Sequence, residues 1–141
     1  MGERIILPAG VFVTPLKRVA NPKGDIYHAL KKSDNGFAGF GEAYFSTIHA
    51  NAIKGWKKHT LMTMNLVVPV GDVEFYLHEE SSGCTYVVHL GEDNYQRLTV
   101  APGLWMAFKG LADGLNLVLN IANITHDPDE AVNVALETFP I

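Results

Sequence analysis

The sequence predicts one all-β domain, a barrel or jelly roll that spans residues 1–141 and ends in a short helical turn. The chain contains 13 glycines and 7 prolines, and these residues interrupt short apolar runs at close intervals along the sequence. Because 48% of the residues are apolar, a chain of this length can bury one continuous core. Many short strands joined by turns are typical of β-barrels and jelly rolls.

Charge and cysteine content exclude several classes of function. The formal net charge of −4 and the sequence pI of about 5.8 provide no basic surface for a nucleic-acid backbone. Cys84 is the only cysteine, so an intrachain disulfide is impossible and a reducing compartment is expected. The N-terminal apolar run is too short for a signal peptide, and no stretch approaches the roughly 20 apolar residues of a membrane span. We therefore expect a soluble, cytoplasmic protein that binds neither nucleic acid nor membrane.

The strands can be assigned in chain order from turn chemistry and residue preference. Residues 21–24, Asn-Pro-Lys-Gly, form a predicted turn because proline presets one φ angle and glycine accepts a positive one. Strands are expected on both sides of this turn. Runs rich in β-branched and aromatic residues predict the later strands, which cover residues 39–48, 52–56, 62–70, 73–78, 86–90, 95–100, 104–109 and 115–121.

Two local patterns make more specific predictions. Residues 73–78 alternate between apolar and polar positions, which is typical of a half-buried strand. The Pro-Val-Gly-Asp sequence at 69–72 predicts a turn or bulge that lets the strands on either side pair as a hairpin. In the tail, residues 128–136 are predicted to be helical, with Asp127 capping the first turn and Pro128 at the first helical position.

Three segments in order resemble the dTDP-4-dehydrorhamnose 3,5-epimerase family, whose members are cupin barrels. Residues 17–25 are similar to the family's early Asp-x-Arg-Gly turn. Residues 53–59, IKGWKKH, resemble its Leu-Arg-Gly-Leu-His-Tyr-Gln segment, and the Gly-Asp-Val at 71–73 matches its Gly-Glu-Val. Residues 101–108, APGLWMAF, are similar to its Pro-Pro-Gly-Phe-x-His-Gly-Phe element. The resemblance implies a cupin jelly roll and an enzyme of carbohydrate biosynthesis that acts on a dTDP-4-keto-6-deoxyhexose.

The same resemblance implies that this chain has replaced most of the family's catalytic residues. The histidine base falls at Lys57 and the arginine of the same segment at Lys54. The catalytic tyrosine falls at about Asn120, and the histidine of the proline-glycine element at Met106. The aspartate that orients the base lies in a C-terminal segment that this shorter chain is expected to lack.

Lys57 and His59 are the best candidates for the proton transfer that such a reaction needs. If Trp56 points to one face of a strand, these two side chains share the other face. An imidazole ordinarily titrates near pH 6.5, whereas Lys57 would need burial or neighbouring cations such as Lys54 and Lys58 to lower its pKa. The alternative interpretation is a solvated basic cluster with no catalytic role.

Further residues are candidates for contacts with substrate. By resemblance, Lys54 and Lys23 would contact phosphate or the sugar carbonyl, and His28 would hydrogen-bond to the substrate. Aromatic rings that can stack on a ligand or simply pack are Tyr44 and Trp105. Amides within apolar strands need a hydrogen-bond partner when they are buried. Asn65 and Asn120 are therefore candidates for contacts with a ligand in a pocket. Surface exposure for Lys23 and a purely structural role for His28 are the alternatives.

No metal or other cofactor is expected. The positions at which many cupins bind a metal through histidine carry Lys57 and Met106. The expected partner is a nucleotide-sugar, and the family's dimers imply a homodimer with residues 11–13 near its interface. Three functions follow from these patterns: an epimerase or isomerase that abstracts a proton next to a ketone, a non-catalytic cupin that binds sugars or nucleotide-sugars, and a structural oligomerisation module.

Overall fold

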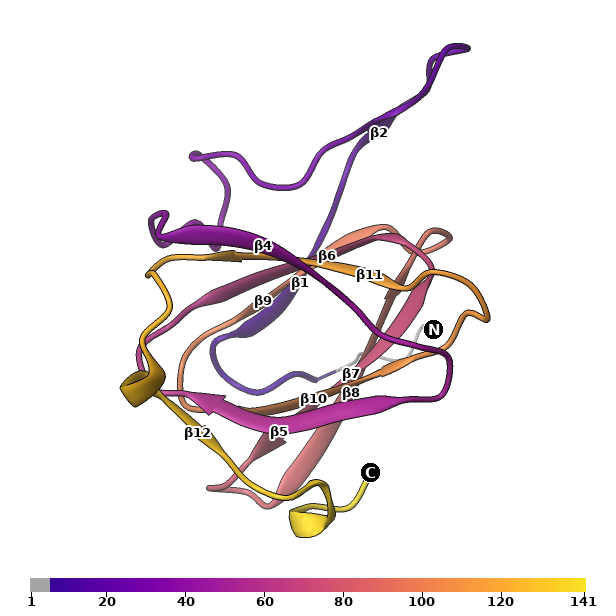
Figure 1. The fold of residues 1–141 in the computed structure, drawn as a ribbon. Coiled ribbons are helices and arrows are strands. Elements are labelled where there is room, and N and C mark those ends of the chain that lie inside the picture. Colours follow the sequence, from indigo (N-terminus) through magenta and orange to yellow (C-terminus); the bar gives the residue numbers. More distant parts are fainter. Residues whose placement is uncertain (1–5) are drawn as a thin grey trace.

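The computed structural model describes residues 6–141 and contains two five-stranded antiparallel sheets that face each other (Figure 1). The first sheet has the order β1 (Val11–Pro15), β9 (Gln96–Val100), β6 (Met64–Val70), β11 (Leu117–Ala122) and β4 (Glu42–Thr47). The second has the order β12 (Ala131–Asn133), β5 (Ile53–His59), β10 (Trp105–Gly110), β7 (Asp72–Glu79) and β8 (Cys84–Gly91). The predicted all-β jelly roll is confirmed, and each of the eight later strands lies where the sequence predicted it.

The main core lies between the two sheets and follows from the two-residue periodicity of the strands. On β7, Val73, Phe75 and Leu77 are fully buried and pack with apolar side chains of the facing sheet. Strand β7 is more buried than the half-buried strand that the sequence predicted. Tyr76 and His78 on its opposite face are also buried, at 5% and 7% exposure. A C-terminal segment covers that outer face.

The predicted hairpin between residues 62–70 and 73–78 is wrong. Strand β6 pairs with β9 and β11 in the first sheet, whereas β7 pairs with β8 and β10 in the second. Gly71 lies at the corner between them with φ of +85°, a left-handed conformation that glycine adopts readily. A Cβ at this position would approach the Leu115 carbonyl oxygen to 2.4 Å. The turn therefore carries the chain from one sheet to the other.

An arm made of the residues between β1 and β4 projects from the barrel (Figure 1). The predicted turn at 21–24 lies at its tip and joins the short antiparallel strands β2 (Arg18–Val19) and β3 (Ile26–Tyr27). The returning part of the arm is fixed to the first sheet by Arg97, whose side chain is fully buried. The Arg97 guanidinium donates to the carbonyl oxygens of Ala29 at 2.8 Å and Asn35 at 2.9 Å.

The C-terminal tail is a strap across the second sheet. Its predicted helical turn begins as expected, because Pro128–Glu130 is a 3₁₀ turn and the Asp127 side chain accepts a hydrogen bond from the Asp129 N–H. The predicted helix over 128–136 is wrong beyond Glu130, since residues 131–133 form β12 and hydrogen-bond to the edge of β5. A second 3₁₀ turn follows at Leu136–Thr138. Within residues 6–141, no helix is long and apolar enough to span a membrane.

Candidate functional site

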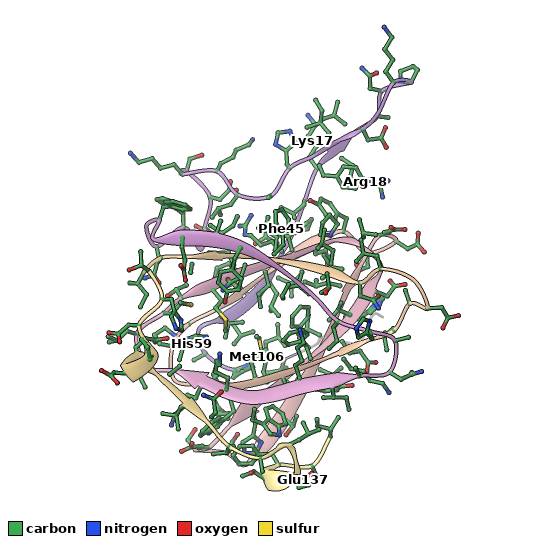
Figure 2. The ribbon with its side chains drawn as sticks, in the orientation of Figure 1. Lys17, Arg18, Phe45, His59, Met106 and Glu137 are labelled. Atoms are coloured by element: carbon green, nitrogen blue, oxygen red, sulfur yellow. The ribbon has the colours of Figure 1, made fainter. Side chains whose placement is uncertain are left out.

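A cavity of about 350 Å³ opens between the two sheets. In Figure 2, His59 and Met106 lie between the sheets, whereas Lys17 and Arg18 lie on the arm. Each sheet contributes both polar and apolar side chains to the cavity lining. The polar lining residues are Tyr44, Ser46, Lys54, Lys57, His59, Asn120 and Asn133, and the apolar ones include Met64, Leu66, Phe75, Met106, Phe108 and Val118.

His59 ends strand β5 and is paired with a buried carboxylate. Its Nδ1 is hydrogen-bonded to Oε1 of Glu130, and the two residues are 8% and 4% exposed. The other carboxylate oxygen, Oε2, accepts backbone N–H groups of Thr60 at 3.1 Å, Leu61 at 3.0 Å and Met62 at 3.1 Å. Because Glu130 is held in this way, His59 is oriented with Nε2 as the nitrogen left for the cavity.

The environment of Glu130 favours its ionised form. Burial by itself raises the pKa of this carboxyl, but the hydrogen bond to His59, the N–H groups of Leu61 and Met62 and the charge of the imidazole outweigh burial. The pKa of Glu130 is therefore below its ordinary value. A carboxylate that stays charged can stabilise an imidazolium formed beside it.

The alternation predicted for β5 is confirmed. Lys57 and His59 line the cavity, whereas Trp56 faces the outside and packs under the C-terminal strap with Tyr76 and Trp105. Lys54 also lines the cavity, and its Nζ donates to the Thr47 carbonyl oxygen at 2.6 Å. Of the three lysines that the sequence assigned to the site, Lys54 and Lys57 thus line the same cavity as His59.

Tyr44 and Asn120 lie on the wall formed by the first sheet. They are cross-strand partners on β4 and β11, and the Asn120 Nδ2 donates to the Tyr44 hydroxyl oxygen at 3.0 Å. Asn120 is 3% exposed, whereas Tyr44 is 43% exposed at the mouth. These are the two substrate-contact candidates that the fold brings to the cavity from the first sheet.

The other candidates are not brought to this cavity. Lys23 and His28 are on the arm, outside the cavity lining. Asn65 is buried in the arm anchor, where its Oδ1 accepts from Arg97 and Thr99 and its Nδ2 donates to the Gly36 carbonyl. Trp105 packs in the outer aromatic cluster, and its indole N–H donates to Glu80. In residues 6–141, no three His, Cys, Asp or Glu side chains are grouped closely enough to hold a metal ion.

Glu130 is the main site residue that the sequence did not identify. The sequence assigned no carboxylate partner to His59, and Glu130 supplies one from the C-terminal strap. The acidic turn after Asp127 was a signal for it, but helix capping explained the same residues. Asn133 of β12 was missed for the same reason, since a strand here was not predicted.

Comparisons with known proteins agree with this architecture. The dTDP sugar isomerase of Desulfovibrio desulfuricans G20 is 32% identical, with a TM-score of 0.88 and coverage of 92% of this chain and 87% of that one. The sugar 3,4-ketoisomerase QdtA of Thermoanaerobacterium thermosaccharolyticum, solved with TDP, is 19% identical with a TM-score of 0.77, covering 89% of each chain. The spore coat polysaccharide biosynthesis protein SpsL of Bacillus subtilis (strain 168) is 22% identical over 86% of this chain and 83% of its own length. No family model matches the sequence.

Proposed function

Because this chain belongs to the cupin family that contains dTDP-sugar isomerases and the dTDP-4-dehydrorhamnose 3,5-epimerases, we propose that it isomerises or epimerises a dTDP-linked 4-keto-6-deoxy sugar. The observation that carries this proposal is the His59–Glu130 pair on the cavity wall. A base with a fixed tautomer, facing a cavity that also holds cationic side chains, is what proton abstraction next to a ketone requires.

His59 is the proposed base. With Nδ1 bound to Glu130, its Nε2 removes a proton from the carbon beside the sugar ketone, and the C–H electrons move to the carbonyl oxygen to give an enolate. The Glu130 carboxylate stabilises the imidazolium that results. Lys57 and Lys54 line the same cavity, and an ammonium group there stabilises the charge that develops on the enolate oxygen.

The site favours a shift of the carbonyl to the neighbouring carbon. In that reaction the imidazolium returns its proton to the former carbonyl carbon on the same face. The adjacent hydroxyl passes its proton to the enolate oxygen, so the former ketone becomes a hydroxyl and the former hydroxyl becomes the new ketone. One base is enough for this proton shuttle, whereas inversion of a centre needs a donor on the opposite face. By the resemblance, the family's catalytic tyrosine falls at about Asn120, an amide that does not supply a proton at neutral pH.

The proposal is tested by incubating the protein with dTDP-4-keto-6-deoxyglucose in deuterated water and following the sugar by NMR. We expect solvent deuterium next to the carbonyl and a new 3-keto product. Incorporation at both neighbouring carbons with inversion would instead show a 3,5-epimerase. Tight binding without any exchange would overturn the enzymatic proposal and favour the non-catalytic sugar-binding alternative.

Matched variants assign the base. His59→Gln is expected to lower the exchange rate roughly 100-fold or more, whereas His49→Gln removes an exposed histidine outside the cavity lining and leaves it unchanged. Lys57→Met and Lys58→Met form a second pair, because these adjacent lysines point to opposite faces of β5 and Lys58 pairs with Glu80. Equal losses in both members of either pair would contradict the assignment.

We also propose that the protein is a cytoplasmic homodimer. The free, exposed Cys84 suits a reducing compartment. Strand β1 lies at the edge of the first sheet, and the projecting arm exposes Ile26 and Tyr27 at 57% and 39%, which suits contact with a second copy. Light scattering of the purified protein tests the dimer, and a monomeric mass would overturn it.

A further inference from the structure

We infer that Asn120 and Tyr44 together form a recognition site for one hydroxyl group of the bound sugar. This inference rests on the proposed function, because it assigns a specificity-determining contact within the same cavity. It starts from Asn120 Oδ1, a fully buried oxygen that receives no hydrogen bond from any group in residues 6–141. A buried acceptor without a donor destabilises a fold, and this one belongs to a side chain that lines the cavity.

The neighbours of Asn120 fix which way its amide points. Its Nδ2 lies 3.0 Å from the Tyr44 hydroxyl oxygen and 3.9 Å from the Met62 sulfur. The thioether can only accept, so the nitrogen belongs on this side and the oxygen on the other. Because the cross-strand register of β4 and β11 places Tyr44 opposite Asn120, the pair is held together by the sheet itself.

The same hydrogen bond determines what Tyr44 can offer. Its hydroxyl oxygen accepts from Asn120, so its own proton remains available to donate. The pair therefore contains one acceptor that lacks a donor, Asn120 Oδ1, and one available donor, Tyr44 O–H, on adjacent strands. A sugar hydroxyl both donates and accepts, so a single hydroxyl satisfies the two groups. A site built to pair with a hydroxyl rejects an analogue that lacks it, because the buried oxygen is then left unpaired.

The experiment measures binding alone, with probes that have no ketone and are not turned over. Calorimetry compares dTDP-6-deoxyglucose with its 2-deoxy, 3-deoxy and 4-deoxy analogues. We expect one analogue to bind wild type roughly 10- to 100-fold more weakly than the parent. Asn120→Leu, which keeps the branching at Cγ and removes both polar atoms, is expected to abolish that difference while leaving the other two ratios within about twofold.

Two further variants keep the outcome decisive. Tyr44→Phe, at a half-exposed position, is expected to reduce discrimination against the same analogue even if Asn120→Leu does not fold. His49→Gln changes an exposed residue outside the cavity lining and is expected to leave the discrimination intact. Equal affinities for all four probes in wild type, or ratios unchanged in both Asn120→Leu and Tyr44→Phe, would overturn the inference. Failure of the parent probe to bind would overturn it as well. Turnover of the 4-keto sugar without any discrimination would overturn the inference and leave the proposed function standing.

Discussion

At the scale of single residues, Glu130 is a positioning residue that acts on the reaction only through His59. Its Oε2 is occupied by three backbone N–H groups and its Oε1 by the imidazole. Glu130 therefore has no free oxygen for substrate, and its effect is to select the tautomer and to stabilise the charged imidazole.

Replacement of Glu130 by glutamine keeps the shape and removes the charge. We expect Glu130→Gln to lower kcat by about 10²- to 10⁴-fold with a small change in KM. Glu130→Asp keeps the charge at a shorter reach and is expected to retain part of the activity. Steady-state kinetics checks this split, with circular dichroism to confirm folding. A change confined to KM would show that Glu130 contacts substrate.

Asn65 and Asn120 show how far residue patterns predict the site. Both are asparagines within apolar strands, and the sequence placed both in the pocket. Only Asn120 lines it, because Asn65 faces the opposite side of β6, where Gly36 and Arg97 complete its hydrogen bonds. The loop that covers Asn65 is distant in sequence, so local alternation carries no information about it. Lys57 and His59 were predictable because their relation depends only on one strand.

At the scale of elements, the C-terminal strap links the outer face of the second sheet to the chemistry of the cavity. It carries Glu130 and β12, and the Leu136 carbonyl oxygen accepts the Trp56 indole N–H at 3.1 Å. Phe139 packs on Trp56, His78 and Trp105, with ring centroids 5.5, 3.9 and 5.6 Å away. These contacts hold the strap against the strand that bears His59.

Loss of the Phe139 ring is expected to weaken both stability and activity. Phe139→Ala removes three aromatic contacts from a partly buried side chain, which costs about 2 kcal/mol of unfolding free energy. Phe45→Ala is the matched control, because Phe45 is 64% exposed and its removal should cost under about 0.5 kcal/mol. Urea denaturation measures the unfolding free energy of both variants. Equal losses would show that the strap contributes no more than an ordinary surface residue.

Strand positions were predictable from the sequence, but their partners were not. Residues 62–70 and 73–78 are strands as predicted, since β-branched runs and alternation are local properties. Their separation into different sheets depends on the corner at Gly71 and on strands far along the chain. Residues 131–133 are the opposite case. Their local sequence favours a helix, but pairing with the edge of β5 makes them the strand β12.

At the scale of the whole molecule, the buried Glu130 carboxylate makes stability depend on pH. The pKa of Glu130 is lowered in the folded state below the ordinary value of 4.5. A lowered carboxyl pKa stabilises the fold fully above the unfolded-state pKa, and this contribution is lost as the pH falls through the folded-state pKa. The stability contributed by Glu130 is therefore present at neutral pH and disappears in acid.

Denaturation at several pH values checks this dependence. We expect Glu130→Gln to be less stable than wild type by about 2 kcal/mol at pH 7, with the difference shrinking as the pH is lowered below about 4. Glu137→Gln changes an exposed carboxyl on the same strap and should track wild type throughout. A difference that stays constant with pH would show that Glu130 contributes by packing rather than by charge.

The position of Glu130 on the strap also determines when the site is completed during synthesis. All the strands of the barrel except β12 precede it in the chain, so they emerge from the ribosome first. Until the strap has been synthesised and has docked, His59 has no carboxylate partner and Trp56 has no covering strap. A chain can thus hold a nearly complete barrel, with His59 already on β5, and still lack the carboxylate that orients this base until the strap is in place.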